Sequence, residues 1–486
     1  YFNNTGDRLK LTDIVKWGSI AWSSFEYSFR GCNNLVISAT DVPDVSAVSS
    51  MIWAFHTCTS LSGNFDITGW DLSSVIDVSY MFFGCNQLTF IDMSSLNIAN
   101  SISCQGVAAG CTNLTEIVFP VAFKPTDISY LVQDTVNLVS ITNIENWDTT
   151  SLALTYAMFA NSTFNQDIGA WDVSNMTNMQ GMFYLASSFN QDISGWTIKS
   201  SGSVTMRSMF QGATSFNQPI GSWNTSAVGD MYRMFYSAVS FNQPLNTWNT
   251  VSVGNMSEMF LNTIFDQDIS SWNVSNVFDF QRFMRTRRVP YVNLDVSGWV
   301  FRSAGVNANG MFAYPAVAVY NTAFPTGIDT WTTTGMTNIG DMFVNSKLTG
   351  TLDISGWDVS SVTNMSYALH GLSNPVTMVS LSGWNTSNVT NMTDLFRFFN
   401  KASGSYGVEN WDVSSLSIAG SFLQAATPLT TAEYDALLVN WEAQAPSNAV
   451  TINFGVSTYT LGSASETART SLINTYGWTI TDGGGI

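Results

Sequence analysis

Apolar and polar positions recur along this chain in a fixed order. The stretch Phe164–Trp272 reads FNQDIGAWDVSNMTNMQGMF and then returns to FNQDISGW, FNQPIGSWNTS, FNQPLNTWNT and FDQDISSWNVS at intervals of about 25 residues. With Trp171 as the phase marker, equivalent tryptophans recur from Trp17 to Trp411. Repetition at a fixed period of 20–50 residues is typical of a solenoid. Degenerate copies fill the longer gaps, with other residues in the Trp position: Pro43, Leu96 and Ala122.

Each repeat unit has its own internal pattern. The Phe-Asn-Gln-Asp-Ile segment alternates and predicts a short strand. A Met-x-x-Met-Phe segment, as at Met179–Phe183, places apolar groups on one face of a single helical turn. The preceding Asp/Asn-x-Ser/Thr supplies a turn or a helix cap. The sequence therefore predicts a repeat solenoid of about sixteen coils, with short parallel strands and short helical turns.

The pattern divides the chain into three parts. Residues 1–16 form an N-terminal lead-in, and residues 17–426 form the solenoid. Residues 427–486 lose the repeat and predict helix, strand, helix and strand, which together make a small α/β cap over the last coil. Within the opening residues, KLTDIVKW predicts a short strand that leads into the first coil.

Composition narrows the classes of partner. Of the 486 residues 45% are hydrophobic and 13% aromatic, which is enough apolar area for a packed core. The formal net charge of −18 argues against nucleic acid as a partner. No run of 18 apolar residues occurs, so we expect no membrane insertion. Low charge and an acidic surface favour an extracellular or virion-exposed location.

Four of the five cysteines share one position in successive repeats: Cys32, Cys58, Cys85 and Cys111. Stacked coils would bring neighbouring Cα atoms to about 4.8 Å, which is within disulfide range. Later repeats place Ala186, Ala213 and Ala238 at this position, which favours a column of small buried side chains. A disulfide or a metal site stays an alternative, although zinc would need His in phase with the column.

Asparagine and glutamine also recur in phase. The members of these columns are Asn165, Asn190, Asn217 and Asn242, with Gln166, Gln191, Gln218, Gln243 and Gln267. In a stacked parallel array such side chains form amide ladders between coils. A polar face that binds a glycan is the alternative interpretation.

The pattern breaks most sharply just after the regular copies. Four arginines stand within seven positions: Arg282, Arg285, Arg287 and Arg288. The insertion Ala313–Gly327, with Tyr314 and Tyr320, follows in the longest repeat. Insertions in repeat arrays become loops, often on the binding face, and arginine binds sulfate, phosphate or carboxylate bidentately. We therefore expect a binding site here, with a contact to a neighbouring subunit or a solvated patch as alternatives.

The sequence predicts no enzyme. With only two histidines, His56 and His370, a histidine-based triad or metal centre has too few members. No phosphate-binding glycine loop stands before a helix. We expect no catalytic residue, cofactor or metal.

The repeat resembles that of BspA-type leucine-rich-repeat surface proteins. The FNQDIxxWDVSNxTNMxxMF unit, the Phe-x-Gly-Cys-x-x-Leu blocks at Phe29–Leu35 and Phe82–Leu88, and the C-terminal module carry the likeness. The resemblance implies a leucine-rich-repeat-like solenoid that serves as a non-catalytic extracellular adhesion or recognition module, on a cell surface or a virion surface, whose partner is a cell-surface glycan or protein receptor. The opening YFNNTGDRLKL is similar to the junction at which such repeats follow a small β-sandwich domain, which implies that residues 1–16 are the end of a preceding domain. A phage tail fibre or receptor-binding protein is the alternative. Assembly into a homo-oligomer or a larger structure stays open.

Overall fold

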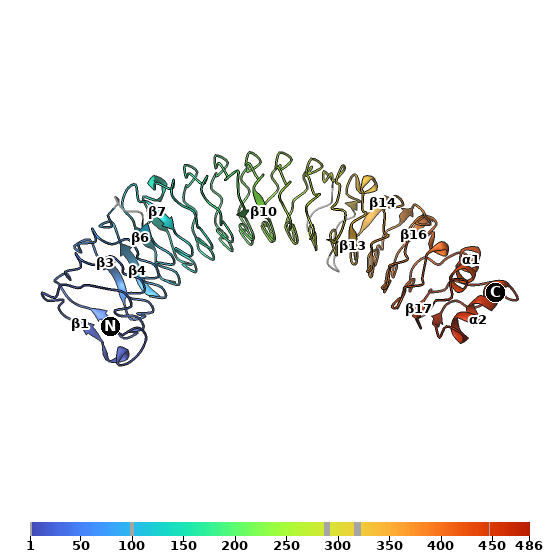
Figure 1. Cartoon of the computed structure of the whole chain (residues 1–486), viewed down its shortest axis with the longest axis horizontal. Helices are drawn as coiled ribbons and strands as arrows, with labels where there is room; N and C mark the ends of the chain where they lie inside the picture. Colours follow the sequence, from blue (N-terminus) through green and yellow to red (C-terminus); the bar gives the residue numbers. More distant parts are fainter. Residues whose placement is uncertain (1, 98–101, 286–291, 315–321, 447) are drawn as a thin grey trace. The chain divides into compact units, whose positions relative to one another are not determined.

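The computed structural model describes residues 2–97, 102–285, 292–314, 322–446 and 448–486. These residues form two compact units, Tyr1–Gln243 and Pro244–Ile486. Each unit is a stack of parallel coils, which Figure 1 shows as a series of similar loops one behind another. The predicted repeat solenoid with a C-terminal α/β cap is confirmed.

In the first unit every described strand pair is parallel, and the partners lie one coil apart. The largest sheet has the order β3-β4-β6-β8, with β3 at Ser62–Asp66, β4 at Gln87–Asp92, β6 at Glu116–Val118 and β8 at Ser140–Thr142. The two-stranded pairs are β1 (Asp13–Ile14) with β2 (Val36–Ile37), β5 (Ile102–Ser103) with β7 (Pro125–Asp127), and β9 (Val204–Thr205) with β10 (Val228–Asp230). Two 3₁₀ turns are η1 (Arg8–Lys10) and η2 (Ile144–Asn146).

The second unit repeats this plan. Its four-stranded sheet has the order β12-β14-β15-β16, at Thr322–Ala323, Leu348–Leu352, Val376–Met378 and Lys401–Gly404. Strand β11 (Val306–Asn307) pairs with β13 (Met336–Asn338), and β17 (Thr451–Asn453) pairs with β18 (Thr479–Thr481). The 3₁₀ turns are η3 (Ile328–Thr330) and η4 (Val408–Asn410), and the helices are α1 (Thr431–Glu442) and α2 (Ala464–Asn474).

The tryptophan column lies in the core and also links the coils by hydrogen bonds. The indole N–H of Trp171 donates to the carbonyl of Ile144 at 3.0 Å, and that of Trp272 donates to Leu245 at 2.9 Å. The acceptor is always the apolar residue three positions before the Trp position of the preceding coil. The same bond is made by Trp196, Trp223, Trp299, Trp331, Trp357, Trp384, Trp411 and Trp441. Each buried indole thus satisfies its polar atom while it packs.

The Phe-Asn-Gln-Asp-Ile segments are not strands, contrary to expectation. Their side chains take the place of backbone pairing instead. The Asn165 side-chain oxygen accepts the backbone N–H of Asn190 at 2.9 Å, and the Gln191 amide donates to the Asn165 backbone carbonyl at 2.8 Å. The same pair of bonds joins Asn190 to the coil of Asn217 and Asn217 to the coil of Asn242. The predicted amide ladder is therefore confirmed between these coils.

Gln166 shows how the ladder begins. It lies beside β8, the last strand of the first unit's largest sheet. Its side-chain oxygen accepts the N–H of Ile141 at 2.6 Å, and its nitrogen donates to the Ile141 carbonyl at 3.3 Å. The side-chain amide thus pairs with the edge strand as a peptide group would, and satisfies an edge that would otherwise be open.

The Met-x-x-Met-Phe segments are reverse turns rather than helical turns. The N–H of Met182 donates to the carbonyl of Met179 at 3.2 Å, and Gly181 between them has φ 63°. A positive φ at the third residue defines a type II turn. A second such turn follows at once, with Leu185 at φ 57°. A helical turn would use its amides within the coil, whereas here alternate amides donate to the next coil, as Gly181 does to Arg207 at 2.9 Å.

We call these six-residue segments the tandem turns, since two turns follow each other. Their positions one, four and five are buried, and positions two, three and six point outward, as Met231–Tyr236 shows. The left-handed residue at position three recurs in sixteen described coils. It is Tyr27, Trp53, Tyr80, Gly106, Tyr130, Ala157, Gly181, Ser208, Arg233, Glu258, Arg282, Gly310, Asp341, Tyr367, Asp394 and Ser421.

Recurring Asp and Asn residues set the entry to these turns. The side-chain oxygen of Asn178 accepts the N–H of Gln180 at 3.0 Å, and that of Asp230 accepts the N–H of Tyr232 at 2.8 Å. The Asp after the Trp does the same one corner earlier, where Asp172 accepts the N–H of Ser174. The Asp/Asn-x-Ser/Thr motif therefore acts as a turn through a local side-chain bond.

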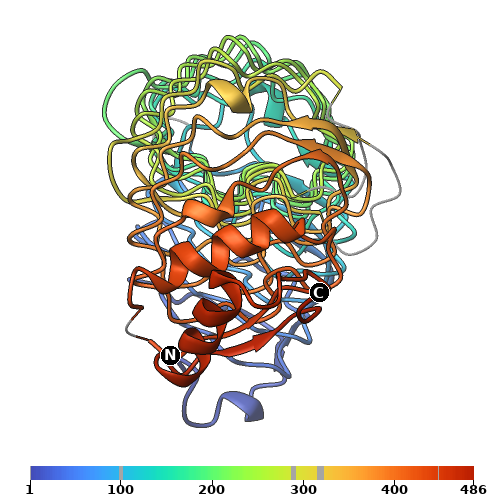
Figure 2. The same ribbon diagram turned by 90° about the vertical axis from the view of Figure 1, so that its right-hand side faces the viewer.

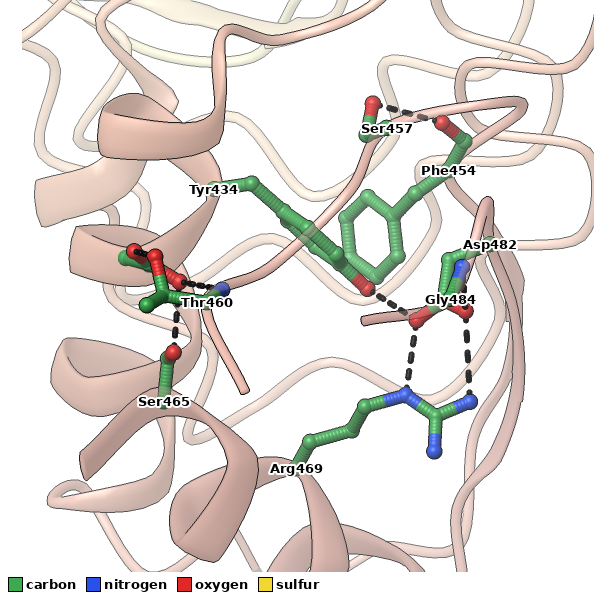
Figure 3. Close-up of polar contacts among 9 residues, drawn as sticks. Tyr434, Phe454, Ser457, Thr460, Ser465, Arg469, Asp482 and Gly484 are labelled. Atoms are coloured by element: carbon green, nitrogen blue, oxygen red, sulfur yellow. Dashed lines mark hydrogen bonds and ion pairs between the residues drawn. The ribbon is translucent and has the colours of Figure 1, made fainter. Parts of the chain in front are cut away.

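The cap closes the second unit with two helices that lie side by side (Figure 2). Helix α1 begins with a capping box, in which Thr430 and Glu433 exchange backbone and side-chain hydrogen bonds. Buried Asp482 fixes the end of the chain. It accepts the Tyr434 hydroxyl at 2.7 Å and the Arg469 Nε at 2.7 Å, so that one carboxylate joins α1, α2 and the segment after β18 (Figure 3).

Candidate functional site

The outward positions of the tandem turns carry a distinctive set of side chains. These positions, which we call the turn face, make up about a tenth of the 486 residues. Among the described residues, these positions hold six of the chain's eleven arginines: Arg30, Arg207, Arg233, Arg282, Arg285 and Arg397. Both histidines are also there, together with Trp53 and several tyrosines. The other corners of the coil carry mainly Ser, Thr, Asn and Asp. Arginine, histidine and outward aromatic side chains are therefore concentrated on the turn face.

In the second unit Arg282 and Arg285 occupy positions three and six of one tandem turn. Together with Asn309, Gly310, Ala313, Asp341 and Val344 they line a cavity of about 140 Å³. Arg282 is partly exposed and holds a left-handed φ of 53°. Its backbone N–H donates to the carbonyl of Asn309 at 2.9 Å, which ties this turn to the next coil. The two arginines that were predicted to form one binding site therefore line the same cavity.

Small residues create this cavity. In the coil that follows the arginines, positions three and six of the tandem turn are Gly310 and Ala313. A Cβ at Gly310 would stand 3.3 Å from Cγ of Arg282, which is tighter than an ordinary contact. Asp341 and Val344 hold the same two positions one coil further on. The space between the two arginines and Asp341 is therefore open, because the coil between them has only Gly310 and Ala313 at these positions.

Charges of both signs border the cavity. Nη1 of Arg282 lies 3.7 Å from Oε1 of Glu258, whose side chain is only 9% exposed. On the far side, Nδ2 of Asn309 donates to the Asp341 carboxylate at 3.2 Å. Glu258 orients Arg282 from the preceding coil, and a partly exposed guanidinium keeps donors directed outward. A ligand with a carboxylate or sulfate group would meet these donors at the cavity mouth.

Of the remaining predicted site residues, only Tyr314 is among the described residues. Arg287, Arg288 and Tyr320 lie outside the described residues. Tyr314 is only 2% exposed, and its backbone N–H donates to the carbonyl of Val344 at 2.9 Å. A buried ring at this position offers no surface contact, so the structure corrects the expectation for Tyr314. Its place directly after the buried Met-Phe-Ala segment explains this, because the coil continues inward there.

In the first unit the same positions form an arginine and tyrosine cluster. The guanidinium carbon of Arg207 lies 4.0 Å from the ring centroid of Tyr232, and that of Arg233 lies 4.8 Å from the same ring. Nη1 of Arg207 is 3.5 Å from Oδ2 of Asp230. Such cation–π contacts hold the guanidinium groups flat on the surface. The sequence interpretation missed this cluster because its arginines stand in different repeats, although the in-out-out-in-in-out pattern of the tandem turn could have shown it.

A stack of flat groups lies on the turn face near the start of the first unit. Arg30 lies 4.1 Å from the ring of Trp53, and His56 is stacked between Trp53 and Phe83 at 4.4 and 4.8 Å between centroids. Burial, with the charge of Arg30, lowers the pKa of His56 to about 4. The rings cover each other's faces, so this stack is chiefly a packing feature.

The cysteines form a buried thiol column. All five cysteines are free, and Sγ of Cys58 donates to the carbonyl of Phe29 at 3.0 Å. Cys85 and Cys111 make the equivalent bond at 3.1 Å. Burial raises the pKa of Cys32 to about 11 and that of Cys111 to about 12. The interpretation as small buried side chains is confirmed over the disulfide alternative.

Within the described ranges, no group of three or more His, Cys, Asp or Glu side chains is arranged to hold a metal ion. No described helix is long and apolar enough to cross a membrane.

Fold and site together define a parallel repeat solenoid with a chemically distinct turn face. The chain belongs to the family described as "Mycoplasma protein of unknown function, DUF285", whose model matches residues 2–119, 126–225, 204–321 and 315–436. No curated protein matches the chain.

Proposed function

We propose that this protein is a non-catalytic extracellular recognition module that binds an anionic ligand, a carboxylated or sulfated glycan, along its turn face. The observation that carries the proposal is the concentration of arginine and flat aromatic side chains at outward turn positions of a chain with net charge −18. An acidic protein of this kind has no general attraction for anions, so binding must depend on local arginines. The resemblance of the repeat to BspA-type surface proteins supports the same role on a cell surface.

The Arg282–Arg285 cavity is the proposed centre of this binding. Guanidinium groups bind carboxylate and sulfate in a bidentate manner, and the partial exposure of Arg282 leaves donors for a ligand. Several coils present such groups on the turn face, which suits a polymeric ligand with more than one anionic group. Several weak contacts along one polymer then add up to firm binding.

The test replaces Arg282, Arg285, Arg287 and Arg288 by Ser in the full chain. Binding to immobilised heparin, a sulfated glycan, is measured at low and physiological salt beside Arg302→Ser. Arg302 is an exposed arginine away from the turn face, so its replacement shows the effect of removing a single arginine elsewhere on the surface. We expect at least tenfold weaker binding for the fourfold variant and little change for the control. Equal binding by wild type and the fourfold variant would remove these arginines as a site.

A further inference from the structure

We propose a second binding site, specific for a neutral pyranose sugar, in a cleft of the first unit lined by Trp17 and Trp70. The cleft has a volume of about 340 Å³ and is lined by these two indoles, Phe65, Asp41, Asp66 and Asn64, among others. Its size falls within the range of small-molecule sites. This cleft belongs to the first unit, whereas the arginine cavity belongs to the second.

The cleft arises because one repeat lacks its tryptophan. Pro43 takes the Trp position between Trp17 and Trp70. In the regular coils neighbouring tryptophans stack nearly parallel, as Trp196 and Trp223 do at 6.0 Å and 8°. Trp17 and Trp70 instead meet across the missing ring, edge to face at 5.5 Å and 79°. The cleft lies beside these two tilted rings.

Neither indole makes the hydrogen bond to the preceding coil that most other column tryptophans make. Trp17 and Trp70 are only 6% and 7% exposed, yet neither indole N–H donates to any acceptor in the described part of the chain. Trp147 also lacks this bond, but its indole nitrogen is sealed from solvent. The nitrogens of Trp17 and Trp70 are not sealed in this way, so they remain within reach of a molecule in the cleft. Each accessible donor can bind water in the free protein and a ligand oxygen in its place.

Acceptors complete the cleft. Asp41 receives the backbone N–H groups of Trp17 and Gly18 at 2.9 and 2.8 Å, and Asp66 receives that of Thr68 at 2.8 Å. These bonds lower the pKa of both carboxyl groups, led by the Trp17 N–H for Asp41 and the Thr68 side chain for Asp66. Each carboxylate is therefore ionised and fixed, and it has lone pairs left for a ligand hydroxyl.

These groups match the chemistry of a sugar ring. A pyranose has an apolar C–H face for an aromatic floor and hydroxyls that both donate and accept. The indole N–H groups can donate to its oxygens, while the carboxylates and the side-chain oxygen of Asn64 can accept its hydroxyls. Two fixed carboxylates repel an anion, so an acidic sugar does not suit the cleft. The ligand class therefore differs from that of the turn face.

The test uses the full chain with ¹⁵N-labelled tryptophan. Methyl β-D-glucopyranoside, methyl α-D-mannopyranoside, methyl β-D-galactopyranoside and glucuronate are titrated while the indole N–H signals are followed by NMR. We expect at least one neutral sugar to bind with a millimolar dissociation constant and to shift the Trp17 and Trp70 signals. Glucuronate should bind at least tenfold more weakly.

Two variants and a matched control assign the site. Trp70→Phe keeps a ring but removes one donor, and Asp66→Asn removes a charge; each should weaken binding several-fold. Asp192→Asn is the control, since Asp192 occupies the same turn position in a coil where the tryptophan bond is intact. Thermal unfolding confirms that each variant is folded. The proposal is overturned if no neutral sugar binds at tens of millimolar, or if both cleft variants bind as Asp192→Asn does.

Discussion

Replacing a core tryptophan by phenylalanine should cost very different amounts at two positions of one column. Trp196 and Trp70 are both nearly buried, and Phe removes the same ring atoms from each. Trp196 also loses its hydrogen bond to the carbonyl of Ile168 at 3.0 Å, while that carbonyl keeps the backbone N–H of Trp171 at 3.2 Å. Trp70 loses no protein hydrogen bond. Because one intramolecular hydrogen bond contributes about 0.5–1.5 kcal/mol net, Trp196→Phe should be the more destabilising by about that amount.

Native-state hydrogen exchange measures this difference locally. A repeat protein can open in parts, so the free energy of opening is read from backbone amides beside each ring. The amides of Trp196 and Trp70 themselves are suitable, since each donates to a carbonyl three residues earlier. Equal losses of opening free energy at the two positions would refute the claim that the indole bond stabilises the regular coils and is missing at the cleft.

Three further predictions follow from buried groups. Because burial raises the pKa of the cysteine thiols, all five should react with a thiol reagent at pH 8 only after unfolding; rapid reaction of any one in the native chain would contradict the buried column. His56 has a folded pKa of about 4, below its unfolded value, so its contribution to stability is lost as pH falls from about 6.5 towards 4; His56→Phe should flatten urea unfolding free energies across this range, and an unchanged slope would refute the assignment. Asp482→Ala should destabilise the cap by about 3–5 kcal/mol, because it leaves Arg469 and the Tyr434 hydroxyl without their buried partner; unchanged amide exchange in α1 and α2 would contradict this.

Much of the fold could be predicted because each repeated apolar residue marks a repeated buried position. A tryptophan every 25 residues has to stack on its neighbours. One position holds Cys in the early coils and Ala in later coils, because both side chains fit a small buried space. The N-terminal strand Asp13–Ile14 and the helices and strands of the cap also follow the pattern of apolar positions. These predictions rest on burial, which the sequence displays directly.

Local backbone geometry was harder to predict. The Met-x-x-Met-Phe spacing fits a helical turn and two consecutive type II turns equally well, since both bury positions one and four. What distinguishes them is the partner of each amide, and those partners lie in the next coil. The same reason explains the Phe-Asn-Gln-Asp-Ile segment, where Asn165 and Gln191 replace the backbone pairing that an alternating pattern suggests.

The candidate site was predicted in part. The cluster of arginines located Arg282 and Arg285, which the structure brings to one cavity. The sequence did not show that Gly310 and Ala313 create the space beside them, because stacking across coils is required to see it. It also suggested an exposed Tyr314, whose ring the structure buries. The cleft at Trp17 was visible only as a missing tryptophan, a gap whose consequence depends on how the neighbouring rings tilt.

A glycan array probed with the intact chain tests the central claim most directly. The array is read in parallel with wild type, the fourfold Arg→Ser variant and the Arg302→Ser control. We predict that wild type and control bind sulfated or carboxylated glycans, and that the fourfold variant loses these signals. Absence of any anionic glycan among the bound ligands, or full retention of them by the fourfold variant, would contradict a recognition role for the turn face.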